Sequence, residues 1–149
     1  MGPVTVLDTQ ALVALLAAEP AASEVEAILR GRDGIASISA VTVAEVMDVL
    51  VRRHARRVET AGDYVTGLLA GGLEVVPVDE EIGRLAGVLR SRHWDSKRRP
   101  VSMADCIVLA TAMTVREPLA TSDRPLIAAA RAEGHPVVAL LDSRGEASE

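Results

Sequence analysis

The sequence predicts an α/β fold: a three-layer sandwich in which a mostly parallel sheet of about five strands is flanked by helices. Short runs of Val, Ile and Leu alternate along the chain with longer segments whose apolar residues recur at helical spacing. Strands and helices that alternate in this way form βαβ units with parallel strands. The 149 residues, 49% of them hydrophobic, suit one globular domain, so we predict a single domain over residues 1–149.

The first half of the chain contains two predicted strands and four predicted helices. In order, they are strand 4–7, helix 9–19, helix 22–31, strand 34–39, helix 40–57 and helix 63–72. The first strand is a β-branched run, and the helices are assigned from the spacing of their apolar residues. Pro20 separates the first two helices because proline cannot continue a helix. Glycines close the fourth helix.

The second half continues the alternation. Its predicted elements are strand 73–78, helix 79–94, a polar loop at 95–100, a helix within 101–113, strand 117–122, helix 123–134 and strand 136–141. In the helix within 101–113, Ser102 as N-cap and Asp105 three residues later predict a capping box. Residues 142–149 are polar, and we expect them to form a frayed tail.

The composition excludes several classes of protein. With one Trp, one Tyr and no Phe, the chain lacks the aromatic residues of a base-stacking platform. The amino-terminal segment has no basic region and contains Asp8, so it does not read as a signal peptide, and no apolar run is long enough to span a membrane. The single cysteine, Cys106, fits a reducing compartment and a buried thiol. We therefore expect a cytoplasmic protein without membrane contact.

Four acidic residues are candidates for one site. Asp8 and Asp123 directly follow predicted strands, Glu45 lies about a turn and a half into the helix after the second strand, and Asp105 stands at the start of its helix after the basic loop. Taken singly, the three aspartates read as helix caps and Glu45 as a solvent-facing residue. The carboxyl ends of parallel strands meet at one edge of the sheet, however, and four carboxylates there repel one another unless a cation lies between them. Carboxylates are ligands that Mg²⁺ and Mn²⁺ prefer. Together the acids predict a site for metal-assisted phosphodiester cleavage.

Four segments, in this order, resemble the PIN domain, and more narrowly the VapC toxins of type II toxin–antitoxin pairs. They are VLDTQALVAL, ISAVTVAEVMDVL, VSMADCIVLATAM and PLATSDRPL. The resemblance spans nearly the whole chain. It implies a ribonuclease that uses Mg²⁺ or Mn²⁺ and leaves 5′-phosphate and 3′-hydroxyl ends. It also implies a homodimer held inactive by a cognate antitoxin, whose tail enters the acidic pocket.

The resemblance also implies roles for the four acids and for one hydroxyl residue. Asp8 and Asp105 would be the principal metal ligands, and Asp123 would complete the pocket directly or through water. Glu45 would orient a water or bind a second metal. Thr121 would donate a hydrogen bond within the pocket.

Near two of these acids, some neighbouring residues match the family pattern and others depart from it. Thr9, after the first acid, is the kind of residue that the family has there, whereas Gln10 is unusual. Met47 and Asp48 stand where the family tends to have small residues. Asp48 shares a helix face with Glu45, and we expect its side chain to face water.

Two basic runs are candidates for contacts with RNA, because an acidic pocket repels RNA unless positive charge lies nearby. The loop at 95–100 precedes the Asp105 helix and contains Lys97, Arg98 and Arg99. It is either an ordinary solvated loop or the place where these three residues bind phosphates, with Trp94 stacking on a base or anchoring the loop. The second run, 52–57, lies at the far end of the Glu45 helix, away from the pocket. Capping of that helix end is a sufficient explanation for it, and a contact with RNA or the antitoxin is the second.

Three other functions fit the sequence less well. A phosphoacceptor receiver domain needs a Lys after the fifth strand, where this chain has Asp142. A phosphatase of the haloacid dehalogenase kind needs a second Asp two residues after the first, where this chain has Gln10. A PIN-like module that only binds RNA or protein is the main alternative, and the complete set of acids argues against it.

Overall fold

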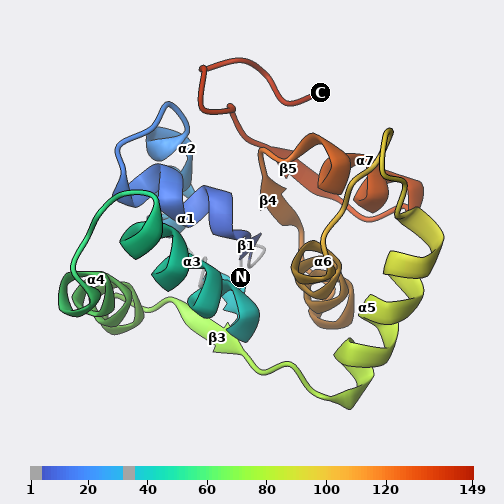
Figure 1. Cartoon of the computed structure of the whole chain (residues 1–149), viewed down its shortest axis with the longest axis horizontal. Coiled ribbons are helices and arrows are strands. Elements are labelled where there is room, and N and C mark those ends of the chain that lie inside the picture. The colour runs from blue at the N-terminus through green and yellow to red at the C-terminus, as the bar shows by residue number, and fades with distance from the viewer. Residues whose placement is uncertain (1–4, 32–35) are drawn as a thin grey trace.

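The computed structural model describes residues 5–31 and 36–149 (Figure 1). Its elements in chain order are β1 (Val6–Leu7), α1 (Thr9–Leu16), α2 (Ala22–Leu29), β2 (Ser37–Ser39), α3 (Ala40–Arg52), α4 (Val58–Ala70), β3 (Glu74–Val76), α5 (Glu80–His93), α6 (Met103–Val115), β4 (Leu119–Thr121), α7 (Arg124–Ala132) and β5 (Val137–Ala139).

The five strands form one parallel sheet in the order β3-β2-β1-β4-β5, which confirms the predicted fold class. Val6 in β1 pairs with Ser37 on one side and Leu119 on the other. The chain adds β2 and then β3 on one side of β1, and afterwards adds β4 and then β5 on the other side. This reversal makes β1 and β4 a topological switch point, where the carboxyl ends of the strands leave a crevice suited to a ligand.

Helices cover both faces of the sheet, with α1 to α4 on the left of β1 in Figure 1 and α5 to α7 on the right. Successive residues of a strand face opposite sides. Accordingly, Val6 and Leu119 pack into the core on the α5–α7 side. Leu7 and Ala120 pack into the core formed with α1 to α4. None of the helices in residues 5–31 and 36–149 is long and apolar enough to cross a membrane.

The boundary between α3 and α4 differs from the prediction. We expected one helix over 40–57 and the next over 63–72, whereas α3 ends at Arg52 and α4 already begins at Val58. Ala55 has a φ of 51° in the left-handed region, and the backbone N–H of Arg56 donates to the carbonyl of Leu50. This closed turn ends the helix before its basic run is complete.

The strands are shorter than predicted, and the last residues are more ordered. Of the predicted strands 4–7 and 34–39, residues 4, 34 and 35 lie outside the described residues. The segment 142–149 forms a turn instead of a frayed tail. Asp142 Oδ1 accepts hydrogen bonds from the backbone N–H groups of Arg144 and Glu146, each at 2.9 Å. Leu141 then bridges to Ala147, and Ser148 is only 1% exposed.

Candidate active site: an acidic pocket at the carboxyl edge of the sheet

Asp8 lies at the centre of the candidate site. It follows β1 and caps α1, where its Oδ1 accepts a hydrogen bond of 2.9 Å from the backbone N–H of Ala11. Its Oδ2 accepts a hydrogen bond from the hydroxyl of Thr121, the last residue of the neighbouring strand β4. The side chain is held from two elements, and the residue is only 5% exposed.

Thr121 joins two acids of the site. While its hydroxyl donates to Asp8, the same oxygen accepts a hydrogen bond of 3.0 Å from the backbone N–H of Asp123. Asp123 in turn caps α7 by accepting from the backbone N–H of Leu126 at 3.3 Å, with Pro125 in the first turn. Thr121 therefore fixes the relative position of the strand-end acids on β1 and β4.

The electrostatics of the site are unfavourable without a cation. Burial raises the pKa of Asp8 to about 7, with the negative charges of Asp123 and Asp105 adding to the rise, while the hydrogen bonds from Thr121 and Ala11 oppose it. Burial also raises the pKa of Asp123 to about 6, again with a contribution from Asp105. The charge of Asp105 thus disfavours the ionised forms of Asp8 and Asp123, and the charge of Asp123 disfavours that of Asp8.

Asp105 has a capping role that is also compatible with a role in the pocket. The predicted capping box is confirmed: the backbone N–H of Asp105 donates to Ser102 Oγ at 3.0 Å, and the backbone N–H of Ser102 donates to Asp105 Oδ2 at 2.8 Å. The cap uses one carboxylate oxygen and leaves Oδ1 for another partner. Cys106, the next residue, is buried, and burial raises the pKa of its thiol to about 11, so the thiol stays protonated.

A pocket of about 210 Å³ lies in front of Asp8. Its walls are formed by Asp8, Thr9, Gln10, Glu45, Asp48, Val49, Arg52, Arg53, Asp105 and Val108. The hydroxyl of Thr9 donates a hydrogen bond of 2.7 Å to Glu45 Oε1, which turns Glu45 toward α1. The pocket brings three of the four predicted acids together, and Asp123 is tied to it through Thr121.

Two arginines in the pocket wall were not expected there. Arg52 and Arg53 belong to the run that we placed away from the site. Helix spacing provides the missing signal, because Arg52 is two turns beyond Glu45 and lies on the same face of α3. Arg52 is bound to Asp48 by two parallel contacts, Nε to Oδ1 at 3.0 Å and Nη2 to Oδ2 at 2.6 Å. Asp48 is therefore an exposed member of an ion pair at the rim.

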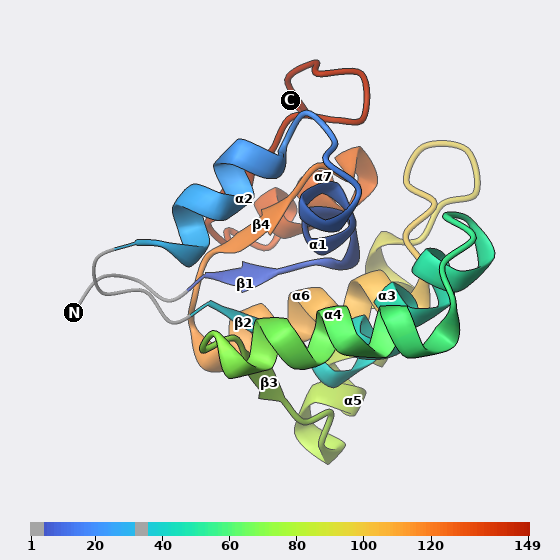
Figure 2. The same cartoon turned by 90° about the vertical axis from the view of Figure 1, so that its left-hand side faces the viewer.

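The loop between α5 and α6 does not line the pocket. Lys97 and Arg98 are exposed, and their backbone N–H groups donate to Asp95 Oδ1 at 2.8 and 2.9 Å. Arg99 instead turns inward, and its Nη1 donates to Nδ1 of the buried His93 at 2.8 Å. Figure 2 shows this loop at the same end of the molecule as the carboxyl end of α3, the end toward which β1 points.

Beside this loop, Trp94 is 52% exposed, and its ring lies 5.5 Å from the guanidinium carbon of Arg90. This cation–π contact holds one face of the indole against α5. The contact fits the anchoring role that the sequence analysis left open for Trp94, and a base-stacking role stays a prediction.

The donor set of the acidic pocket fits a hard divalent cation. Asp8, Asp105 and Asp123 offer only carboxylate oxygens, and their mutual repulsion is the condition that a cation relieves. In the described parts of the chain, no three acidic, His or Cys side chains stand close enough to hold an ion by themselves. Mg²⁺ keeps several waters and is usually bound by one or two carboxylates, so it suits this arrangement.

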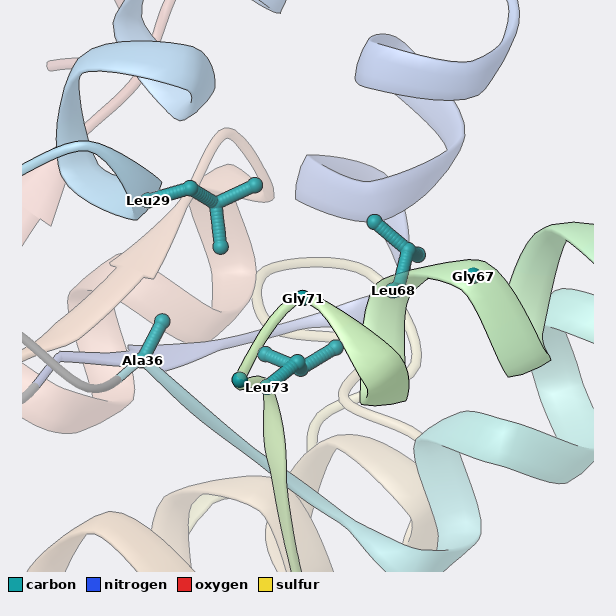
Figure 3. Close-up of a pocket in the computed structure, with 7 residues that line it drawn as sticks. Leu29, Ala36, Gly67, Leu68, Gly71 and Leu73 are labelled. Atoms are coloured by element: carbon teal, nitrogen blue, oxygen red, sulfur yellow. The ribbon is translucent and has the colours of Figure 1, made fainter.

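A different hollow, of about 300 Å³, lies between α2 and α4. Figure 3 shows Leu29 of α2, Leu68 of α4 and Leu73 around it, together with Gly67 of α4 and Gly71, which follows that helix. Its lining contains no titratable side chain. This hollow therefore has no side chain able to perform acid–base chemistry or bind a metal, and the acidic pocket is the better candidate for an active site.

The family model of the PIN domain matches residues 5–138 of this chain. The chain therefore belongs to the PIN domain family. A comparison with curated protein sequences finds no match.

Solved structures with the same fold include members of toxin–antitoxin pairs. VapC20 of Mycobacterium tuberculosis, described as a sarcin–ricin-loop-cleaving toxin, is 20% identical and covers 84% of this chain and 94% of its own, with a TM-score of 0.69. VapBC2 of Rickettsia felis, bound to a promoter DNA fragment, is 16% identical and covers 92% and 98%, with a TM-score of 0.68. FitAcB of Neisseria gonorrhoeae is 22% identical and covers 90% and 96%, with a TM-score of 0.65. At these identities the likeness establishes the fold.

Proposed function

We propose that this PIN domain is a metal-dependent endoribonuclease, the toxin of a toxin–antitoxin pair, which a cognate antitoxin neutralises. The observation that carries the proposal is the convergence of Asp8, Asp105 and Asp123 at the switch point of the sheet, where burial and the neighbouring negative charges raise the pKa of Asp8 and of Asp123. A binding module has no need to maintain this repulsion. A nuclease needs acids close together in spite of their repulsion, because the ionised carboxylates attract a divalent cation.

Each residue of the pocket has a separate role in the proposed hydrolysis of the phosphodiester bond. Asp8 and Asp105, with Asp123 directly or through water, would hold Mg²⁺ or Mn²⁺, which when bound lowers the pKa of a water and stabilises negative charge on the phosphate. Thr121 keeps the Asp8 carboxylate in one orientation. Glu45, held by the hydroxyl of Thr9, accepts a hydrogen bond from the attacking water and aligns it. Attack of the water at phosphorus would break the bond to the 3′ oxygen, which leaves and takes up a proton to become the 3′-hydroxyl, while the other product keeps the 5′-phosphate.

The toxin assignment is supported by the fold neighbours. VapC20 is described as a sarcin–ricin-loop-cleaving toxin, and another structure with the same fold is described as a toxin–antitoxin complex from Klebsiella pneumoniae. An antitoxin tail that carries a cation would pair with the same carboxylates that attract the metal. We further propose that the chain acts in the cytoplasm as a homodimer, and light scattering of the purified protein measures the dimer directly.

The decisive experiment is a cleavage assay on single-stranded and loop-containing RNA. With Mg²⁺ or Mn²⁺ we expect internal cuts whose products carry 5′-phosphates, and EDTA should abolish them. Sequencing of the product ends identifies the chemistry. A purified protein that cuts no RNA in either metal would leave the non-catalytic binding module as the better account.

The exposed loop provides a second test. Lys97→Glu combined with Arg98→Glu should weaken RNA binding and reduce the slope of log Kd against log salt, because each phosphate that the loop no longer neutralises retains about one counterion. Arg99 is left unchanged because it holds His93. Arg30→Glu with Arg131→Glu makes the same charge change at exposed helix ends outside the loop. Equal salt slopes for the two double variants would remove the loop from the RNA interface.

A further inference from the structure

A second cavity adjoins the acidic pocket. It measures about 330 Å³ and lies between α1, the carboxyl end of α3 and the turns that follow β4 and β5. The two cavities share four lining residues: Thr9, Gln10, Val49 and Arg53. A ligand that occupies the acidic pocket can therefore extend into the second cavity without leaving the surface.

Arg53 is the cation at the boundary of the two cavities. Its neighbour Arg52 is already committed to Asp48 through two hydrogen bonds. Among the described residues, no carboxylate lies within ion-pair distance of Arg53, and its side chain is exposed. A guanidinium without a partner next to an acidic pocket is placed to bind a phosphate that continues from that pocket.

Gln10 occupies the same boundary on the α1 side. Its Oε1 accepts a hydrogen bond of 2.8 Å from the hydroxyl of Ser122, so the orientation of the amide is fixed. The two N–H groups of the amide are then left to donate to another molecule. An oriented amide with free donors is suited to acceptor atoms on the edge of a base.

The rest of the cavity offers a surface for a flat ring. Val13 and Val49 supply apolar area, and His54 extends the wall beside Arg53. Two acids also line the cavity, Glu19 and Asp142. Asp142 is already satisfied by two backbone N–H groups of its own turn and lies 3.9 Å from Arg124, so its carboxylate is partly neutralised. The phosphate of a ligand is therefore placed at Arg53, on the boundary with the acidic pocket.

We propose that this second cavity is a subsite for the nucleotide adjacent to the scissile phosphate of a single-stranded RNA. Arg53 binds the phosphate that links this nucleotide to the one in the acidic pocket, Val13 and Val49 contact the face of its base, and Gln10 donates to the base edge. The inference rests on the proposed ribonuclease function and adds a residue-level account of how the substrate is held. It makes Gln10 a determinant of sequence preference.

The test measures binding separately from cleavage. In an Asp8→Asn background without divalent metal, a fluorescently labelled single-stranded RNA oligonucleotide is titrated with Arg53→Gln, Arg53→Lys and Arg56→Gln. Arg56 belongs to the same basic run and lines neither cavity, so it is the matched control. Removal of a charge-assisted hydrogen bond should raise Kd about tenfold for Arg53→Gln, with partial recovery in Arg53→Lys, and should leave Arg56→Gln within about twofold. Gln10→Ala should change the ranking of oligonucleotides that differ at one base.

The outcomes separate the subsite from the nuclease. If the wild type cuts no RNA but Arg53→Gln still loses binding relative to Arg56→Gln, the proposed function fails and the subsite stands. If the wild type cuts RNA and Arg53→Gln binds RNA as tightly as Arg56→Gln, the subsite is overturned while the nuclease function stands. No measurable binding by the Asp8→Asn protein, or an unchanged base ranking in Gln10→Ala, also counts against the subsite. Circular dichroism of each variant verifies the fold.

Discussion

Asp8→Asn is expected to lower the rate of RNA cleavage by at least about a hundredfold, because it removes the central carboxylate of the metal-binding set. The protein should nevertheless stay folded. Asn also caps helices, and Thr121 can accept a hydrogen bond from its amide. Because burial raises the pKa of Asp8 to about 7, replacing it with a neutral group should leave stability at about pH 8 unchanged or higher. Initial cleavage rates and thermal unfolding measure the two effects.

Asp79→Asn is the matched control. Asp79 caps α5 as Asp8 caps α1, with its Oδ1 accepting a hydrogen bond of 2.9 Å from the backbone N–H of Ile82. It lies outside the acidic pocket. If the role of Asp8 were only to cap a helix, the two variants would lose a similar, small amount of stability and neither would lose cleavage. Equal cleavage by both variants would therefore contradict the assignment of Asp8.

The acids of the site could be predicted because their positions follow from local rules. Asp8 and Asp123 stand where a buried strand ends and a helix begins, and these points are visible as changes in apolar spacing. Parallel strands then bring such points to one edge. For Asp105, capping and pocket explanations competed in the sequence, and the structure shows that one carboxylate can cap its helix with Oδ2 and still line the pocket.

The basic residues could not be assigned in the same way, because their roles depend on contacts between distant segments. Arg99 looked equivalent to Lys97 and Arg98, but it is bound to His93, which in turn contacts Glu133 at the end of α7. Nothing in the local sequence indicates that partner. Arg53 was placed away from the site because the predicted helix ran on to residue 57, whereas the turn after Arg52 directs Arg53 to the boundary of two cavities.

Without metal, the protein should become less stable as pH rises, whereas a divalent metal should stabilise it more at high pH than at low pH. In the metal-free protein, the pKa of Asp8 is raised to about 7 and that of Asp123 to about 6. Between about pH 4 and 7 the folded state therefore binds more protons than the unfolded state, and the free energy of unfolding falls as pH rises. Mg²⁺ or Mn²⁺ requires the ionised acids, so it should stabilise the protein at about pH 8 and have little effect at about pH 5. At a hundredfold excess over Kd the gain is about 2.7 kcal/mol.

Other groups of the protein also titrate, so variants are needed to assign the dependence of stability on pH and metal to the acidic pocket. Burial and neighbouring charges raise the pKa of Asp8 and Asp123, whereas the hydrogen bonds accepted by Glu133 and Asp142 lower the pKa of those two carboxyls. The stability that Glu133 and Asp142 contribute is therefore lost only at more acidic pH. Asp8→Asn should therefore flatten the pH profile of the melting temperature above about pH 5 and abolish the metal effect, and Asp79→Asn should keep both. Melting curves in EDTA and in excess Mn²⁺ across this range measure it. If metal raised the melting temperature of wild type and Asp8→Asn equally, the cation would bind outside the acidic pocket, and the reaction would have to be assigned to another site.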